Sequence, residues 1–324
     1  MHDRDCLHRF MFERYPIRGH LVHLDAAWRA LIEHRDYPGS IREALGEAVA
    51  ASLLLAATIK FEGVLSLQMR GDGPVHLILA QCTGGLGVRG LARYREAGNS
   101  GAAAGAEAGA GADAEADATG SGAARIADLI GAGNLTVTLE TDGGAQRYQG
   151  IVPIVGQRLA ESLQVYFENS EQLPTRLWLH ADSEGASGML LQKLPEAELP
   201  QGATAADPAA VEDAWRRVQL IGETLTALEM RTLRDAEILH RLFNEDDVRL
   251  FEPAPVYFRC RCSRERVGGM LQSLGEAESR SVLAERGEVE VHCDFCNRGY
   301  VFDAVDIAQL FNPQVASDRG SSVH

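Results

Sequence analysis

Four of the six cysteines in this 324-residue sequence lie close together near its C-terminal end. They form two close pairs, Cys260 with Cys262 and Cys293 with Cys296, and residues 263–292 separate the pairs. Thiolate pairs on tight turns supply the four soft ligands that structural zinc prefers. Ligation to a metal also keeps thiols deprotonated at neutral pH. The spacing therefore predicts one zinc ion bound by all four cysteines.

Two alternatives to this ligand set remain open. The first pair is tighter than an ordinary zinc knuckle, and the interval between the pairs exceeds the spacing of about 15–20 residues that is common in zinc ribbons. The four residues could therefore be unrelated free thiols, or His292 could replace one cysteine as a ligand. Whichever set holds the metal, oxidants attack thiolates, and a disulfide removes two ligands at once. The cluster is thus also a candidate redox switch.

The remaining composition indicates a cytoplasmic protein that binds neither membranes nor nucleic acids. The N-terminal segment is charged and lacks the apolar core of a secretory signal. The longest apolar stretch, residues 48–59, is much shorter than the roughly 20 residues that span a bilayer. A net charge of −15 would repel nucleic-acid phosphates and anionic membrane surfaces. Cys6 and Cys82 are interpreted as an exposed thiol and a small apolar strand residue.

The N-terminal part combines helical and strand patterns. Residues 40–59 have helical spacing, with Ser40 as the expected N-cap and Glu43 as its capping-box partner. Two pairs of strands are expected, 64–69 with 75–80 and 135–140 with 147–155. Strands and helices in separate runs favour an α+β fold with a mixed sheet over a doubly wound sheet.

Two segments of biased composition interrupt this pattern. Residues 97–124 consist of Ala, Gly and a few acidic or polar residues, and they cannot bury enough apolar surface to form a core. We predict a disordered insertion, although an Ala-rich helix is the competing interpretation. Residues 195–208 are rich in Pro and Ala and are typical of a linker.

A helical region is expected after this linker. Apolar residues recur at spacings of three and four, which indicates one face of a long helix; they are Val211, Trp215, Val218, Ile221, Leu225 and Leu228. A shorter helix is expected at 236–243. Two amphipathic helices need a neighbour for their apolar faces. If they lost it they would expose an apolar surface of the kind that binds other exposed apolar chains, with Trp215, Ile221 and Leu225 as candidate contact residues. The alternative is that these three residues are core in both states.

The cysteine-rich end has the pattern of a small domain. Ser263 is the expected cap of one helix, a second helix is expected at 279–285, strands at 288–292 and 300–302, and a last helix begins at Asp303 and Asp306. A domain with so few large apolar residues needs a covalent cross-link or a bound metal ion to be stable. We therefore divide the chain into an N-terminal α+β domain (1–195), a helical linker domain (196–255) and a C-terminal zinc-binding redox-switch domain with a flexible tail (256–324).

Motifs for enzymatic chemistry are missing from the sequence. Residues 85–90 match the dinucleotide pattern G-x-G-x-x-G, but the segment that follows is too short for the required helix. Glycines of a β-hairpin are the better interpretation. No phosphate-binding loop, nucleophile elbow or zincin motif is present. We predict that the protein is not an enzyme.

With the cysteines in place, the sequence resembles the heat-shock protein 33 family along nearly its whole length. A CxC pair followed by a CxxC pair at this distance is the hallmark of that family. The resemblance rests on residues 7–10 (LHRF), 71–74 (GDGP), 148–150 (YQG), 170–177 (SEQLPTRL), 188–192 (GMLLQ), 260–266 (CRCSRER) and 292–296 (HCDFC). The insertion at 97–124 departs from the expected pattern.

The resemblance implies a redox-regulated chaperone, a holdase that binds unfolding proteins without ATP. It implies that the reduced form binds one zinc ion and is inactive, and that peroxide or hypochlorous acid activates the protein. It further implies disulfides between Cys260 and Cys262 and between Cys293 and Cys296, release of zinc, and a homodimer as the active form.

Two other functions compete with this interpretation. A zinc-knuckle module for nucleic acid is suggested by four arginines beside the first pair, Arg259, Arg261, Arg264 and Arg266, although the overall charge opposes it. A thiol-disulfide oxidoreductase is suggested by the Cys293–Cys296 pair. Its active dithiol would normally open a helix, whereas this pair is expected at a strand turn.

Overall fold

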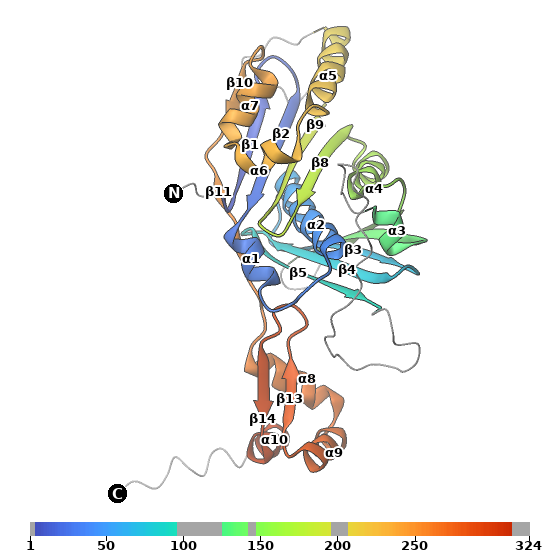
Figure 1. Ribbon diagram of the computed structural model, residues 1–324, viewed down its shortest axis with the longest axis vertical. Helices are drawn as coiled ribbons and strands as arrows, with labels where there is room; N and C mark the ends of the chain where they lie inside the picture. Colours follow the sequence, from blue (N-terminus) through green and yellow to red (C-terminus); the bar gives the residue numbers. More distant parts are fainter. Residues whose placement is uncertain (1–3, 96–124, 142–146, 196–206, 313–324) are drawn as a thin grey trace, which may run out of the picture. The chain divides into compact units, whose positions relative to one another are not determined.

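The computed structural model describes residues 4–95, 125–141, 147–195 and 207–312 (Figure 1). The chain divides into two compact units, Met1–Arg259 and Cys260–His324. The predicted insertion at 97–124 lies outside the described residues, as does most of the predicted linker at 195–208. The domain boundaries at 195 and 255 therefore stay predictions. Within the described residues, the mixed α+β fold class is confirmed.

The first sheet of the N-terminal unit has six strands in the order β10-β1-β2-β9-β8, with β11 paired to β1. All of its pairings are antiparallel. The strands are β1 (Cys6–Phe12), β2 (Ile17–Leu24), β8 (Thr175–Ala181), β9 (Ala186–Lys193), β10 (Val248–Leu250) and β11 (Ala254–Pro255). The sheet thus joins the start of the unit to its end.

The second sheet also has six strands, in the order β12-β5-β4-β3-β6-β7. These are β3 (Gly63–Gly71), β4 (Val75–Thr83), β5 (Gly87–Tyr94), β6 (Gly133–Thr141), β7 (Arg147–Pro153) and β12 (Tyr257–Phe258). Both predicted strand pairs are present as β3–β4 and β6–β7. The glycine-rich residues 84–86 form the turn between the antiparallel strands β4 and β5, which confirms the hairpin interpretation.

The helix α2 (Gly39–Thr58) contacts strands of both sheets, so it is buried on most of its sides. This position explains the long apolar stretch of residues 48–59. Among the described residues, no helix is both long and apolar enough to cross a bilayer. The helix begins at Gly39 with no side-chain cap, so the predicted capping box of Ser40 and Glu43 is wrong. Pro38, whose φ is fixed, precedes the first turn instead.

Three helices cover the other face of the first sheet (Figure 1). They are α5 (Pro208–Gly222), α6 (Ala227–Thr232) and α7 (Asp235–Phe243). The predicted long apolar helix face is wrong beyond Gly222. Thr226 caps α6 through a capping box with Glu229, which starts a new helix, and Leu228 is 61% exposed. The neighbour that the apolar faces need is the sheet itself.

Smaller helices complete the N-terminal unit. They are α1 (Ala26–Ile32), α3 (Ile126–Ile130), α4 (Leu159–Tyr166) and a π-helical turn, η1 (Phe167–Glu171). α4 packs against β7 and β8, one strand from each sheet, so it helps to close the core around α2.

The C-terminal unit contains the predicted small domain. Its elements are α8 (Arg264–Leu274), α9 (Glu276–Arg286), β13 (Val289–His292), β14 (Gly299–Phe302) and α10 (Ala304–Phe311). Ser263 caps α8, and Asp303 with Asp306 forms a capping box at α10, as the sequence predicts. Among its described residues, 260–312, six side chains form the buried apolar core: Val267, Leu271, Val289, Tyr300, Phe302 and Ile307.

Candidate metal and redox centre

The four cysteines of the C-terminal unit are positioned by a loop and a turn. Cys260 and Cys262 lie in the loop before α8, which begins where the Ser263 side chain accepts a hydrogen bond from the Arg266 backbone amide at 3.3 Å. Cys293 and Cys296 lie in the turn between β13 and β14.

That turn is closed by two backbone hydrogen bonds. The amide of Cys293 donates to the Arg298 carbonyl at 3.0 Å, and the amide of Asn297 donates to the Cys293 carbonyl at 2.8 Å. Asn297 has φ of 52°, a left-handed conformation that asparagine tolerates better than most residues. The turn holds both of its thiols on the side that faces the first pair.

The sulfur atoms have the separations of a metal site. Cys260 Sγ lies 3.4 Å from Cys262 Sγ and 3.6 Å from Cys293 Sγ, and Cys262 Sγ lies 3.4 Å from Cys296 Sγ. All four lie within 4.8 Å of one another. A tetrahedron with zinc–sulfur bonds of about 2.3 Å has sulfur–sulfur edges of about 3.8 Å. The four thiols therefore fit one zinc ion, and none of these separations is the roughly 2.05 Å of a disulfide.

The pKa values of the thiols differ because their surroundings differ. Burial raises the pKa of Cys262, but hydrogen bonds from Tyr300 and the neighbouring thiols outweigh burial and bring the pKa to about 7. The Tyr300 hydroxyl donates to Cys262 Sγ at 3.1 Å. Burial raises the pKa of Cys260 strongly and that of Cys296 as well. Tyr300, which the sequence placed only in a strand, is thus part of the cluster.

His292 lies outside the cluster. Its side chain is about half exposed, and its Nε2 atom lies 3.4 Å from a carboxylate oxygen of Glu290. The four ligand atoms that converge within 4.8 Å are all sulfurs. The alternative ligand set with a histidine therefore has no geometric support.

Two of the arginines beside the first pair are engaged within the unit. Arg264 donates to the Val301 carbonyl at 2.7 Å and to Asp306 at 2.6 Å. Its guanidinium carbon lies 4.4 Å from the centroid of the Phe302 ring. Arg266 donates to the Arg261 carbonyl at 2.8 Å. These contacts give both side chains a role in holding α8, β14 and the cysteine loop together, which weakens the case for a phosphate-binding surface.

The Cys293–Cys296 pair follows a strand and sits in a hairpin turn rather than at the start of a helix. A catalytic dithiol of the thioredoxin type uses a helix N-terminus to lower the pKa of its first cysteine. The expected strand turn is confirmed, and the geometry does not favour the oxidoreductase.

Comparison with known proteins identifies the family. The 33 kDa chaperonin of Nitrosococcus oceani is 44% identical over 324 residues, 100% of both chains. That of Methylobacillus flagellatus is 42% identical over 312 residues, 96% of each chain. The family model described as Hsp33 protein matches residues 5–303. The chain belongs to the Hsp33 family. The crystal structure of the 33 kDa chaperonin from Thermotoga maritima, 22% identical, has the same fold with a TM-score of 0.76 over 97% of this chain and 100% of that one.

Membership of the Hsp33 family confirms the resemblance drawn from the sequence. The Hsp33 family consists of redox-regulated chaperones with a four-cysteine site, not of enzymes, and both points agree with the expectations above.

Sequence reasoning missed a second group of side chains whose ligand atoms lie close enough together to hold a metal ion. Cys6, expected to be exposed, is buried in β1, and Cys82 is buried in β4. Cys6, His8 and Asp235 converge, although His8 and Asp235 are 227 residues apart. A single sequence carries no signal for such a distant contact.

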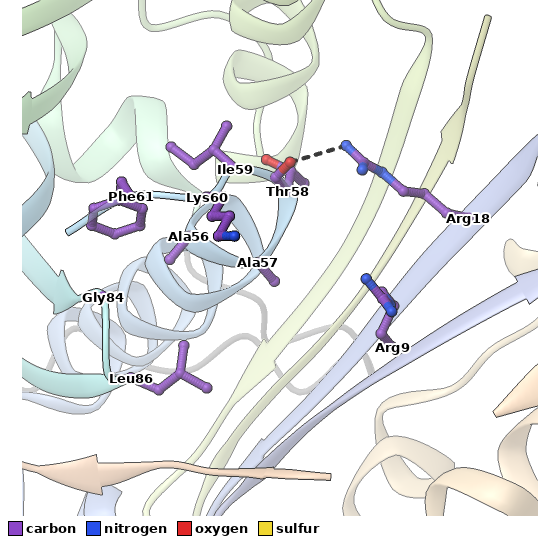
Figure 2. A pocket seen from close by; sticks show the side chains of 10 residues that line it. All are labelled: Arg9, Arg18, Ala56, Ala57, Thr58, Ile59, Lys60, Phe61, Gly84 and Leu86. Carbon is purple, nitrogen blue, oxygen red and sulfur yellow. Dashed lines mark hydrogen bonds between the residues drawn. The ribbon is translucent and has the colours of Figure 1, made fainter. Parts of the chain in front are cut away.

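Two surface cavities of the N-terminal unit also differ in character. Figure 2 shows a cavity of about 410 Å³ with Arg9, Arg18 and Lys60 around it, in which Arg18 donates to the Thr58 carbonyl at 3.1 Å. A second cavity of about 450 Å³ is mainly apolar; its lining includes Leu55, Leu65, Val137, Leu139, Tyr148 and Phe167. Only the second has the chemistry to contact unfolded apolar chains.

Proposed function

We propose that this chain is an ATP-independent holdase that binds one zinc ion through Cys260, Cys262, Cys293 and Cys296 when reduced, and is activated when these thiols are oxidised. The observation that carries the proposal is the convergence of four thiols within 4.8 Å of one another in a unit with six buried apolar side chains. Bound zinc would supply a tetrahedral cross-link between the loop and the turn. Such a unit depends on its cysteines for stability.

The redox step converts four thiols into two disulfides. We assign them to Cys260 with Cys262 and to Cys293 with Cys296, as the family resemblance implies. Each disulfide forms as two thiols lose two electrons and two protons, and one molecule of hydrogen peroxide takes up both to give two molecules of water. Two peroxide molecules therefore oxidise the cluster. Sulfur separations alone do not choose the pairing, because Cys262 lies 3.4 Å from both Cys260 and Cys296.

Oxidation removes the thiolates that a metal needs, so the C-terminal unit loses its main cross-link. Residues 244–259 connect the helical region to this unit, and the last strand of this segment, β12, ends at Phe258, two residues before Cys260. Unfolding of the C-terminal unit would free that end of the edge strand. We propose that the loss spreads back through residues 244–259 to α7 and loosens the helices from the first sheet.

Client binding would then use the surface that these helices cover. Trp215 and Leu225 are buried, and Ile221 is partly buried in the same cluster with Phe10 and Phe12. The three candidate contact residues can reach a client only after α5 and the loop that follows it leave the sheet. The apolar cavity beside Tyr148 is available without that movement and would give a second contact. The clients are unfolding proteins.

Several further properties belong to the same proposal. The active form would be a homodimer, as the resemblance implies. The protein would act in the cytoplasm, because a thiol switch needs a compartment that keeps cysteines reduced until an oxidant arrives. Neither nucleic acid nor membrane would be a partner.

Two measurements test the proposal. Light scattering of an unfolding client should show little protection by the reduced protein and strong suppression of aggregation after peroxide at mildly raised temperature. Zinc content and free-thiol count before and after peroxide should show the loss of about one metal ion and four thiols. Equal protection by both forms, or thiols that resist peroxide while activity appears, would refute the switch.

A further inference from the structure

A second cluster of metal-binding side chains lies in the N-terminal unit, where α7 meets the first sheet. Cys6 and His8 are on β1, His23 is on β2, and Asp235 is the first residue of α7. Cys6 and His8 are two residues apart on a strand, so their side chains share one face of the sheet. Cys6 is also paired with His23 in the strand register. The helices cover this same face, which brings Asp235 over the three side chains.

The distances within the cluster are short. Cys6 Sγ lies 3.8 Å from His8 Nδ1, and His8 Nδ1 lies 2.6 Å from Asp235 Oδ2. These three ligand atoms all lie within 4.8 Å of one another. The other carboxylate oxygen of Asp235 lies 2.6 Å from His23 Nε2. Cys6, His23 and Asp235 are buried, and His8 is 17% exposed, so the cluster is sheltered but reachable.

We propose that Cys6, His8 and Asp235 bind a divalent transition metal of the zinc class, and that His23 orients the Asp235 carboxylate. Sulfur, imidazole nitrogen and carboxylate oxygen are the donors that zinc accepts, whereas calcium and magnesium require oxygen donors. A metal-bound carboxylate is commonly oriented by a neighbouring polar group, and His23, with Nε2 2.6 Å from the second Asp235 oxygen, is assigned that part here. One thiolate and one carboxylate also balance the two positive charges.

The two distances from His8 Nδ1 are close to those of a zinc site. In a tetrahedral zinc site the sulfur–nitrogen edge is about 3.6 Å and the nitrogen–oxygen edge is about 3.3 Å. The first matches the 3.8 Å between Cys6 and His8, while the second means that His8 and Asp235 separate by roughly 0.7 Å from their present 2.6 Å. His8 would carry its proton on Nε2, and the Cys6 thiol would release one proton to solvent. The fourth position is left for water.

A metal at this position would fasten the N-terminus of α7 to β1. The site shares no residue with the four-cysteine cluster, so it can be tested separately. The test uses the full-length chain with all four C-terminal cysteines changed to serine, loaded with Co²⁺ or Zn²⁺ and passed through gel filtration. We expect about one metal ion per chain by elemental mass spectrometry, and a thiolate-to-cobalt charge-transfer absorption band.

Matched variants in that background identify the ligands. Cys6→Ser should weaken metal binding at least tenfold and abolish the charge-transfer band. Cys82→Ser, which changes the other buried cysteine of the N-terminal unit, should leave both unchanged. Because Cys6→Ser could disturb folding, His8→Gln is measured in the otherwise unaltered chain, where retained metal should fall from about two ions to about one.

Absence of metal from the chain that lacks the four cysteines would overturn the proposal, as would equal effects of Cys6→Ser and Cys82→Ser. Neither result would touch the proposed redox switch, because that switch uses cysteines which this background does not contain. Conversely, failure of the switch in the unaltered chain would leave this metal site standing.

Discussion

Removing the metal from the reduced protein should unfold residues 260–312 and leave the core around α2 folded. The expectation follows from the difference between the cores. The C-terminal unit buries six apolar side chains, each worth about 1.5–3 kcal/mol, whereas the N-terminal unit has two far larger apolar clusters around its sheets. A structural zinc site contributes about 10–16 kcal/mol to folding. That is as much as the roughly 5–15 kcal/mol by which a whole domain is stable.

Hydrogen exchange followed by mass spectrometry distinguishes the two units peptide by peptide. The protein is treated with a chelator in the presence of a reductant, so that no disulfide forms. Amides of β13, β14 and α8 should lose protection, by about tenfold for each 1.4 kcal/mol of stability lost, while amides of α2 should not change. Re-addition of zinc should restore the protection. A metal-free C-terminal unit that stays protected would refute the reasoning, because six buried side chains would then suffice.

Three further perturbations test particular contacts. Burial raises the pKa of Glu47 in α2 to about 8, with Arg158 opposing, so the folded state holds a proton that the unfolded state releases above about pH 4.5. The free energy of unfolding should therefore fall as the pH rises from about 4.5 to 8. In urea unfolding at pH 8, Glu47→Gln should be more stable than the parent by about 3–5 kcal/mol. The control Glu33→Gln, at an exposed site, should not show this gain. At Gly222 an added Cβ would lie 2.5 Å from Trp178 Cζ2, so Gly222→Ala should displace the end of α5 and give the reduced protein partial activity in the light-scattering assay. Gly39→Ala, where the Cβ meets nothing within 4 Å, is its control, and equal behaviour of the two would count against helix release. Tyr300→Phe removes the hydrogen bond to Cys262 Sγ and should weaken zinc binding about tenfold or more in a chelator competition; an unchanged affinity would show that the hydroxyl does not support the site.

The sequence predicted the C-terminal unit better than any other part. Its information is local: Ser263 and Asp303 are caps that act within three residues, and the thiols lie on a loop and a turn. The same kind of local reasoning failed at Ser40, because Pro38 determines where α2 begins. It failed again at Leu228, because a capping box at Thr226 interrupts a helical pattern that looks continuous in sequence.

What the sequence could not predict depends on contacts between distant residues. The helices α5–α7 show an apolar face, but nothing in their sequence says that this face packs on β1, β2 and β9. The position of α2 between two sheets is similarly a property of the whole unit. The contact between His8 and Asp235 is the extreme case. It exists only because α7, near the end of the N-terminal unit, packs on the face of the sheet to which β1, near its start, contributes His8.

The segment between α7 and the cysteines explains how a local oxidation could affect distant helices. Residues 248–258 contribute β10, β11 and β12, which have three, two and two residues, and β12 lies at the edge of its sheet. Beyond the strand ladders, single backbone hydrogen bonds hold the segment, such as Val256 to the Asp5 carbonyl at 2.9 Å and Arg259 to the Val88 carbonyl at 2.9 Å. Short edge strands of this kind open at low free energy.

Such a segment stays in place only while its ends are fixed. One end is α7, whose first residue, Asp235, contacts His8 and His23 on the sheet. The other end is the folded four-cysteine unit. If oxidation unfolds that unit, the segment keeps a single anchor, and the helices are then held on the sheet by the apolar cluster between them and by the contacts of Asp235 with His8 and His23. The strength of these contacts therefore sets how far the structural change can spread from the cysteines.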